Sequence, residues 1–398
     1  MDYGSDGRTY LGLGIISGTS ADGIDTALIS IKEIGNNWQM EFLGGQTYAY
    51  PHDLRQEILD LCGGAKRSLR QIMELDRQIS LVLSESALQL SRELKHQPDF
   101  ISSHGQTVWH CPPQGDQLGY SWQMGRGDII AHHTGITTIS NFRQGDMAVG
   151  GQGAPLVSIV DFYLLRHDHI DRVAQNIGGI SNCTYLPQGC TLESVRGWDN
   201  APGNVLIDLA MTRLYGKLYD VNGAVARSGT IHPELVNAWL KDEFLQLPPP
   251  KSTGREWFSP AYLEQKLKEC AVHNLSHPDI IATLTEFTAR SIRQSYDQFL
   301  PCIPPEIIIS GGGVHNQFLL DRLSLHLAPS RVLSCEQLGI NADYKEAIAF
   351  ALLGYLRLKG YASNLPQVTG AQRPVSLGEI YVPPHTITDE IVFAPFPA

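Results

Sequence analysis

The 398-residue sequence lacks the marks of several protein classes. Its seven cysteines are odd in number and include no Cys-x-x-Cys pair, which argues against a disulfide framework or a structural zinc site. No apolar run approaches the roughly 20 residues of a membrane helix. The start, MDYGSDGRTY, is polar and acidic and lacks the features of a signal peptide. These absences predict a protein of a reducing compartment, the cytoplasm.

The chain also lacks an excess of positive charge. Its formal net charge is −11, which argues against a nucleic-acid partner, because such a partner favours a basic surface. Hydrophobic residues make up 42% and charged residues 18% of the chain, so a sizeable core can form. The length allows about two to three domains.

Strand-like and helix-like segments alternate along the chain, which is typical of α/β proteins. Residues 11–17 and 27–31 predict a β-hairpin, and RVAQNIGGISNCTYL, from Arg172, predicts a second one. Both turns are rich in glycine and in Ser, Thr or Asn, which suggests two duplicated α/β halves facing each other across a cleft. The other expected segments are a short strand at 100–102, a loop at 197–203 before a helix from about Asn204, an irregular stretch at 220–260, and helices at 72–94, 155–165, 279–300, 316–327 and 342–358.

The loop of the first hairpin, SGTSADGID (17–25), combines glycines, hydroxyls and carboxylates. Gly18 and Gly23 permit a tight turn whose exposed N–H groups, with the hydroxyls, can bind phosphate oxygens. Asp22 and Asp25 repel phosphate, so they would hold Mg²⁺, directly or through water, or bond to hydroxyls or a basic residue. The chain contains no G-x-x-x-x-G-K-[ST] P-loop. An ordinary hairpin turn is the alternative reading.

Two further loops offer chemistry. Gly311–Gly313 follow a buried strand and precede a helix that Asn316 could cap. Consecutive glycines suit a loop against which a flat ligand such as adenosine lies, and they equally suit a plain strand–loop–helix connection. Asp199 lies between Trp198 and a Pro-Gly loop, where a carboxylate can act as a general base or simply cap a turn.

Two other segments contain histidines or basic residues that could contact a ligand. SHGQTVWH (103–110) carries His104 and His110, but without a third spaced ligand they favour sugar hydrogen bonding or core packing over a metal site. KSTGREWF, from residue 251, offers Lys251 and Arg255 as cationic contacts for a carboxylate or phosphate, with a solvated surface as the alternative.

Together these segments resemble the anhydro-N-acetylmuramic acid kinase family of the actin–hexokinase–acetate kinase superfamily. The resemblance runs in order through nearly the whole chain: SGTSADGID (17–25), SHGQTVWH (103–110), NFRQGDMAVGGQGAPLV (141–157), NIGGISN (176–182), DNAPGNVLID (199–208), PPKSTGREWF (249–258), ATLTEFTARSI (282–292), SGGGVHN (310–316) and EAIAFALLG (346–354). It implies two actin/hexokinase-like (ribonuclease H-like) α/β domains with mixed five-stranded sheets around a central cleft. The expected domains are residues 1–140, completed by 376–398, and residues 141–375.

The resemblance also implies an activity. The family converts 1,6-anhydro-N-acetylmuramic acid and water to N-acetylmuramic acid 6-phosphate in peptidoglycan recycling, with ATP and Mg²⁺, and homodimers are common among such kinases. The residues that it implies are Gly18, Thr19, Ser20, Ala21, Asp22, Gly23, Ile24 and Asp25 for the ATP phosphates, Gly311, Gly312, Gly313 and Asn316 for the nucleoside, Asp22 and Asp25 for Mg²⁺, Asp199 as the catalytic base, and His104, Gln106, Arg143 and Glu346 around the sugar.

The sequence departs from the family pattern at three places. Ala21 stands where leucine is usual, Asn200 and Ala201 replace Thr and Gly beside the expected base, and Asn141 replaces an aspartate. These changes bear on rate and substrate preference more than on fold or ATP binding. Two alternatives remain: a kinase of the same fold that acts on an ordinary hexose or amino sugar by direct attack of a hydroxyl on ATP, and a non-catalytic nucleotide-dependent switch.

Overall fold

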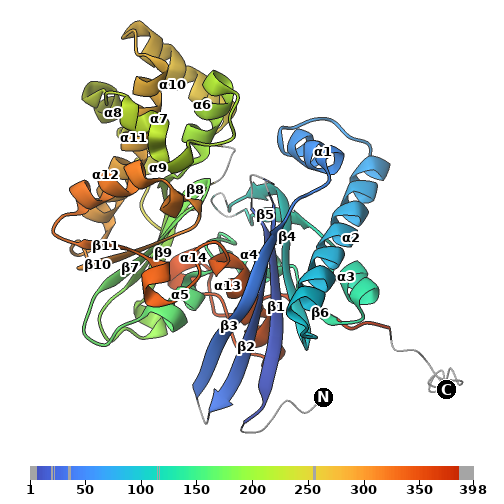
Figure 1. Cartoon of the computed structure of the whole chain (residues 1–398). Helices are drawn as coiled ribbons and strands as arrows, with labels where there is room; N and C mark the ends of the chain where they lie inside the picture. The colour runs from blue at the N-terminus through green and yellow to red at the C-terminus, as the bar shows by residue number, and fades with distance from the viewer. Residues whose placement is uncertain are drawn as a thin grey trace, which may run out of the picture.

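The computed structural model describes residues 7–18, 21, 23–34, 37–113, 115, 117–253 and 257–384. Over these ranges the chain forms two halves, each built on one β-sheet with helices packed around it (Figure 1). Among the described residues, no helix is both long and apolar enough to cross a membrane.

The first sheet has seven strands, in the order β12-β6-β4-β1-β2-β3, with β5 paired to β4. Strands β1–β2 and β2–β3 are antiparallel, and β1–β4 and β4–β6 are parallel. The strand bounds are β1 Thr9–Ser17, β2 Ile24–Ile34, β3 Asn37–Tyr48, β4 Phe100–Cys111, β5 Tyr120–Met124, β6 Thr137–Ser140 and β12 Glu379–Tyr381.

The second sheet repeats this arrangement in the order β11-β10-β7-β8-β9, with the same sequence of parallel and antiparallel pairs. Its strands are β7 Arg172–Ile177, β8 Ile180–Leu186, β9 Arg196–Pro202, β10 Glu306–Ser310 and β11 Arg331–Ser334. The two mixed five-stranded sheets are therefore confirmed, and β5 and β12 extend the first one. The shared strand order also supports the predicted duplication.

Helices cover both sheets. Capping explains where the two longest begin: Ser68 and Gln71 cap α2 reciprocally, and Ser276 and Asp279 do the same for α11. The helices are α1 His52–Cys62, α2 Leu69–Leu94, α3 Gly127–Thr134, α4 Phe142–Met147, α5 Ser158–Leu165, α6 Val205–Tyr215, α7 Ala224–Ser228, α8 Pro233–Trp239, α9 Glu243–Gln246, α10 Pro260–Val272, α11 His277–Phe299, α12 Gln317–Leu327, α13 Lys345–Leu358 and α14 Pro366–Thr369, with short 3₁₀ turns at Leu192–Ser194, Val221–Gly223, Gly312–His315 and Cys335–Leu338.

Three sequence expectations need correction. The strand expected at 100–102 continues to Cys111, because its later residues pair with β5. The loop expected at 197–203 is mostly strand β9, which pairs with β8. The stretch at 220–260 contains the short helices α7, α8 and α9, whose apolar residues pack into the core of the second half. Helices of four to seven residues contain too few apolar positions to show a helical period, so the spacing of apolar residues did not predict them.

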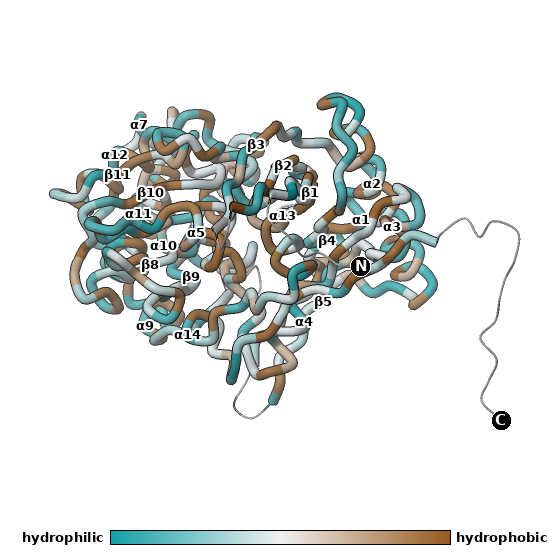
Figure 2. The backbone as a smooth tube through the Cα atoms, turned by 90° about the horizontal axis from the view of Figure 1, so that it is seen from below, coloured by the Kyte–Doolittle hydropathy of each residue, from teal (hydrophilic) through white to brown (hydrophobic). Residues whose placement is uncertain are grey.

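Helix α13 joins the two halves. Glycines let it approach the first sheet closely: a Cβ on Gly14 would lie 1.8 Å from the carbonyl oxygen of Ala347, and one on Gly354 would lie 2.7 Å from Ser102. Figure 2 shows the apolar course of α13 beside β1. Helix α13 packs on the first sheet, although its residues fall in the range expected for the second domain. Strand β12 pairs with β6 of the first sheet, in agreement with the expectation that the C-terminal residues complete the first domain. The division into domains at residue 140 stays a prediction.

Candidate active site

The first loop is held where β1 ends. Ser17 Oγ lies 2.9 Å from the Gly23 carbonyl oxygen and 2.6 Å from Gln106 Oε1. Gln106, fully buried, also donates from Nε2 to the Gly18 carbonyl oxygen at 3.2 Å. Both ends of the Gln106 amide therefore serve the loop in this structure, and its expected contact with the sugar stays a prediction.

Helix α1 supports the middle of the same loop. Arg55 Nε donates to the carbonyl oxygen of Ala21 at 2.7 Å, and the Ala21 N–H donates to Gly18 at 3.0 Å. Ala21 is fully buried and has a left-handed backbone conformation, with φ of 47°. Sequence reasoning missed Arg55, which no motif contains. The other expected phosphate-binding residues Thr19, Ser20 and Asp22 lie outside the described residues.

Asp25 and Ile24 open strand β2 on the other side of the loop. Ile24 is fully buried, so only its backbone can face a ligand. Asp25 Oδ1 accepts a hydrogen bond from Thr47 Oγ1 at 2.7 Å. Mg²⁺ usually takes one or two carboxylates together with water and substrate phosphates, and the Asp25 carboxylate can supply one of these donors. Among the described residues, no group of three or more His, Cys, Asp or Glu side chains could hold a metal alone.

Asp199 lies on strand β9, only 5% exposed. Its N–H donates to the carbonyl oxygen of Lys251 at 3.1 Å, and the N–H of Thr253 donates to Asp199 Oδ2 at 2.8 Å. The segment 251–253 thus holds both the backbone and the carboxylate of the expected base.

The residues that replace Thr and Gly in the family pattern are both buried beside Asp199. Asn200 Oδ1 accepts from Ser181 Oγ at 2.8 Å, and Asn200 Nδ2 donates to Gln175 Oε1 at 2.9 Å. Ala201 is fully buried. Asn200 therefore belongs to a hydrogen-bonded core network, and its side chain supports the strand that carries the base.

Arg143, on α4, connects the expected site residues. Its Nε donates to His104 Nε2 at 3.1 Å, and its Nη1 donates to the Gly153 carbonyl oxygen at 3.3 Å. Desolvation lowers the pKa of Arg143, and the negative charges of Asp199 and Glu346 oppose this shift. Arg143 is thus close enough to interact electrostatically with two carboxylates from different elements, β9 and α13.

Glu346, near the start of α13, binds the second half. Asn176 Nδ2 donates to Glu346 Oε1 at 3.1 Å. Desolvation raises the pKa of Glu346, while the charges of Lys345 and Arg143 and the bond from Asn176 oppose the shift. Lys345 Nζ in turn pairs with Asp161 Oδ1 at 2.6 Å.

The glycine loop packs against the same Asn176. Gly311 has φ of 78°, and a Cβ there would lie 2.6 Å from Asn176 Oδ1. A Cβ on Gly313 would lie 2.6 Å from Ile177, whereas one on Gly312 would meet nothing closer than Asn204 Nδ2 at 3.8 Å. Gly311 and Gly313 are thus required by packing, and Gly312 leaves space open.

Asn316 caps helix α12, as the sequence predicted. Its Oδ1 accepts from the Leu319 N–H at 3.0 Å. The side chain oxygen is thus used in capping the helix. Its expected contact with the nucleoside stays a prediction.

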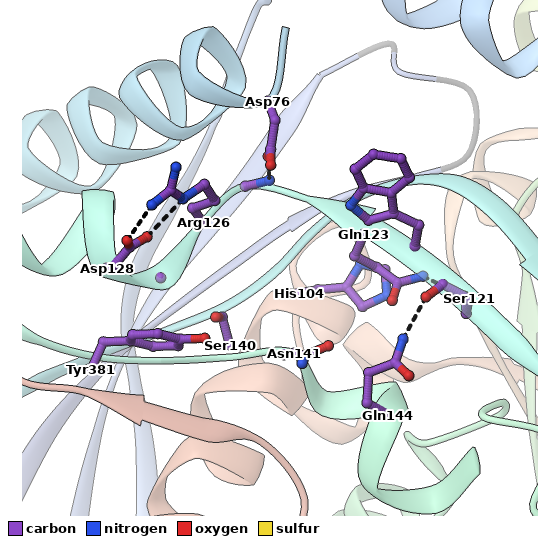
Figure 3. A pocket seen from close by; sticks show the side chains of 13 residues that line it. Asp76, His104, Ser121, Gln123, Arg126, Asp128, Ser140, Asn141, Gln144 and Tyr381 are labelled. Atoms are coloured by element: carbon purple, nitrogen blue, oxygen red, sulfur yellow. Dashed lines mark hydrogen bonds and ion pairs between the residues drawn. The ribbon is translucent and has the colours of Figure 1, made fainter. Parts of the chain in front are cut away.

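A polar cavity of about 380 Å³ lies in the first half, and His104 forms part of its wall. Figure 3 shows His104 among three amide side chains, those of Gln123, Asn141 and Gln144. Asn141, which replaces the family aspartate, has φ of 60° and donates to Glu379 Oε1 at 2.8 Å, so β12 holds it. Sequence reasoning singled out His104 and Asn141 from this wall, and it quoted Gln144 within the segment 141–157 without giving it a role.

Comparisons with known proteins identify relatives of this chain. A family model described as anhydro-N-acetylmuramic acid kinase matches residues 9–383. The anhydro-N-acetylmuramic acid kinase of Rippkaea orientalis is 49% identical over 378 residues, covering 92% of this chain and 98% of the relative. That of Synechocystis sp. is 47% identical over 382 residues, covering 94% and 98%.

Solved structures give more distant matches. A ROK family glucokinase from Streptomyces griseus in complex with glucose and AMPPNP has a TM-score of 0.37 and 13% identity, covering 86% of this chain and 97% of the other. The matching family model and the close relatives both span nearly the whole chain. This chain therefore belongs to the anhydro-N-acetylmuramic acid kinase family.

Proposed function

We propose that this chain is an ATP-dependent kinase that converts 1,6-anhydro-N-acetylmuramic acid and water to N-acetylmuramic acid 6-phosphate, in the cytoplasmic recycling of peptidoglycan. The observation that carries the proposal is the buried carboxylate of Asp199, which the Thr253 N–H holds at 2.8 Å. Arg143, whose Nε donates to His104 Nε2, feels the negative charges of Asp199 and Glu346. Membership of the family supports the same activity.

The proposed reaction has one hydrolytic and one transfer component. The carboxylate of Asp199 takes a proton from water as the water oxygen bonds to carbon 1 of the sugar. The bond from carbon 1 to oxygen 6 breaks, oxygen 6 bonds to the γ-phosphorus of ATP, and ADP leaves. Thr253 orients the carboxylate through its N–H, since that bond fixes one carboxylate oxygen.

The charged phosphates need donors and a counter-charge. The backbone of the first loop, Gly18–Asp25, held by Ser17 and Arg55, would bind the phosphates, and the open face of Gly312 would accept the nucleoside. Bound Mg²⁺ supplies charge neutralisation for phosphoryl transfer, and Asp25, with Asp22, would hold it. Arg143, Glu346 and His104 would position the sugar.

Two substrates separate this proposal from its closest alternative. The protein is incubated with ATP and Mg²⁺ and either the anhydro sugar or ordinary N-acetylmuramic acid, and ADP release is followed. Turnover of the anhydro sugar alone supports the proposal, turnover of the ordinary sugar alone favours direct hydroxyl attack, and turnover of neither favours a nucleotide-dependent switch. Asp199→Asn should abolish turnover of the anhydro sugar yet leave ATP affinity nearly intact.

A further inference from the structure

Lys251 is buried in the second half beside the expected base. Its side chain is only 5% exposed, and Nζ donates to the carbonyl oxygen of Phe244 at 3.0 Å. Two aromatic rings contact the ammonium: Nζ lies 4.7 Å from the ring centroid of Phe244 and 5.1 Å from that of Phe299. The ammonium therefore does not reach the surface, and the expected role as a cationic contact for a phosphate does not fit. Arg255, its expected partner in that role, lies outside the described residues.

Besides the contact of the Lys251 side chain with Phe244, the segment 251–253 contacts two other parts of the fold. The Lys251 carbonyl oxygen accepts the N–H of Asp199, and the Thr253 N–H donates to Asp199 Oδ2. Between them, Ser252 Oγ donates to Gln152 Oε1 at 2.9 Å. Because residues 251–253 are consecutive, the side chain of Lys251 fixes the backbone that holds Asp199.

Among the described residues, Asp199 and Cys183 are the two titratable groups that act on Lys251. The Asp199 carboxylate favours the charged form of Lys251, and it acts in the same way on Arg143, on α4. The Cys183 thiol stays neutral, because burial raises its pKa far above its usual range. Glu346 faces Arg143 from α13. Burial lowers the pKa of Lys251 to about 8, so its ammonium loses its charge within an accessible range of pH.

We propose that Lys251 is a positioning residue for the catalytic base, which anchors the segment 251–253 and places a buried positive charge near Asp199. The inference rests on the proposed function, in which Asp199 takes the proton from water. The ammonium has two effects: its bond to Phe244 holds the segment in place, and its charge favours the ionised form of Asp199. Loss of the ammonium should lower kcat and leave ATP binding unchanged.

Lys251→Met tests this proposal, and Lys266→Met is its matched control. Lys266 is also a buried lysine of the second half, 8% exposed, and its Nζ lies 5.0 Å from the ring centroid of Tyr262. Its charged partner is Glu269 rather than Asp199. Lys251→Met should lower kcat at pH 7 at least about tenfold, keep the KM for ATP within about twofold, and shift the acidic limb of the kcat profile to higher pH. Lys266→Met should leave kcat and the acidic limb unchanged.

Lys251→Arg gives a second readout, which does not depend on the methionine variant folding. The wild-type kcat should fall as pH rises through about 8, where the ammonium is lost. Arginine keeps its charge, so this decline should move to higher pH in Lys251→Arg. Two results would overturn the inference. One is a fall of kcat at acidic pH that is the same in Lys251→Met as in the wild type, and the other is a fall of kcat at alkaline pH that is the same in Lys251→Arg as in the wild type. Full turnover by Asp199→Asn would instead overturn the proposed function, so the two failures are distinguishable.

Discussion

Arg143 Nε donates to His104 Nε2 at 3.1 Å, and this bond determines the state of the histidine. Because Nε2 accepts, His104 carries its proton on Nδ1, which lies 3.0 Å from the Gly105 carbonyl oxygen. Burial and the charge of Arg143 keep the pKa of His104 well below its usual value. His104 is therefore neutral, and it orients the guanidinium that faces Asp199 and Glu346.

His104→Ala should weaken use of the sugar. The substitution leaves a guanidinium N–H without its acceptor, so Arg143 is no longer held in place, and misplacement of a group that positions substrate can lower kcat/KM for the sugar by up to about 100-fold. Steady-state kinetics measure this loss, and the KM for ATP should stay the same. Replacement of the exposed His96 by alanine is the control. Wild-type kcat/KM in His104→Ala would show that the histidine does not position Arg143.

Stability should fall as the solution becomes acidic. Burial, with the charge of Arg143, lowers the pKa of His110 to about 3 and that of His104 well below 6.5. The unfolded chain binds these protons below about pH 6.5 and the folded chain does not, so stability is complete above that pH and is lost below it. Urea unfolding at pH 7.5, 6 and 5 should show a loss of up to about 1.4 kcal/mol per pH unit for each histidine.

His110→Asn isolates one of these two contributions. Its free energy of unfolding should depend about half as steeply on pH between 6 and 5 as that of the wild type, because one of these two buried histidines, His104, remains. An identical slope in the variant would mean that His110 is protonated in the folded protein.

Asn200→Ala should destabilise the fold. The change removes two hydrogen bonds of a buried network, one from Ser181 Oγ and one to Gln175 Oε1. Ser181 Oγ keeps the Ala201 carbonyl oxygen and Gln175 Oε1 keeps the Tyr296 hydroxyl, so the loss should be that of two ordinary hydrogen bonds, about 1–3 kcal/mol in total. Denaturant unfolding measures the loss. Asn200→Thr, which restores the usual family residue, can replace only part of the network and should lie between the wild type and Asn200→Ala. Unchanged stability of Asn200→Ala would contradict the role given to this network.

Gly312→Ala should weaken ATP binding without weakening the fold. A Cβ at this position enters open space, so thermal stability should remain within about 1 °C or 2 °C of the wild type. If the nucleoside lies against this loop, the methyl group should raise the Kd for ATP about tenfold or more, measured by calorimetry. Gly311→Ala is the contrast, since its Cβ would clash with Asn176 and should lower stability as well. Unchanged ATP affinity of Gly312→Ala would place the nucleoside elsewhere.

The sequence predicted the repeated hairpins well, because each carries strand periodicity and a glycine-rich turn within a few residues. It did not reveal that Asp199 lies on a strand, because Pro202 and Gly203 just downstream resemble a loop while pairing of β9 with β8 decides the conformation. It also offered Lys251 as a cationic contact for a carboxylate or phosphate, with a solvated surface as the alternative, and it missed the burial by Phe244 and Phe299, which are 7 and 48 positions away in the chain. The Arg55 side chain donates to the backbone carbonyl of Ala21, and Thr253 donates its backbone N–H to Asp199. In each contact one partner is a backbone atom, which every residue carries, so the sequence pattern did not reveal it.

The most direct test of the coupled reaction follows the oxygen of water. The protein is incubated with ATP, Mg²⁺ and 1,6-anhydro-N-acetylmuramic acid in ¹⁸O-labelled water, the reaction is stopped early, and unlabelled product in the same water corrects for exchange at carbon 1. The account predicts label at carbon 1 of the 6-phosphorylated sugar and none in the phosphoryl group, with no product from Asp199→Asn. Label in free phosphate, or a phosphorylated sugar that still contains its anhydro bridge, would contradict it.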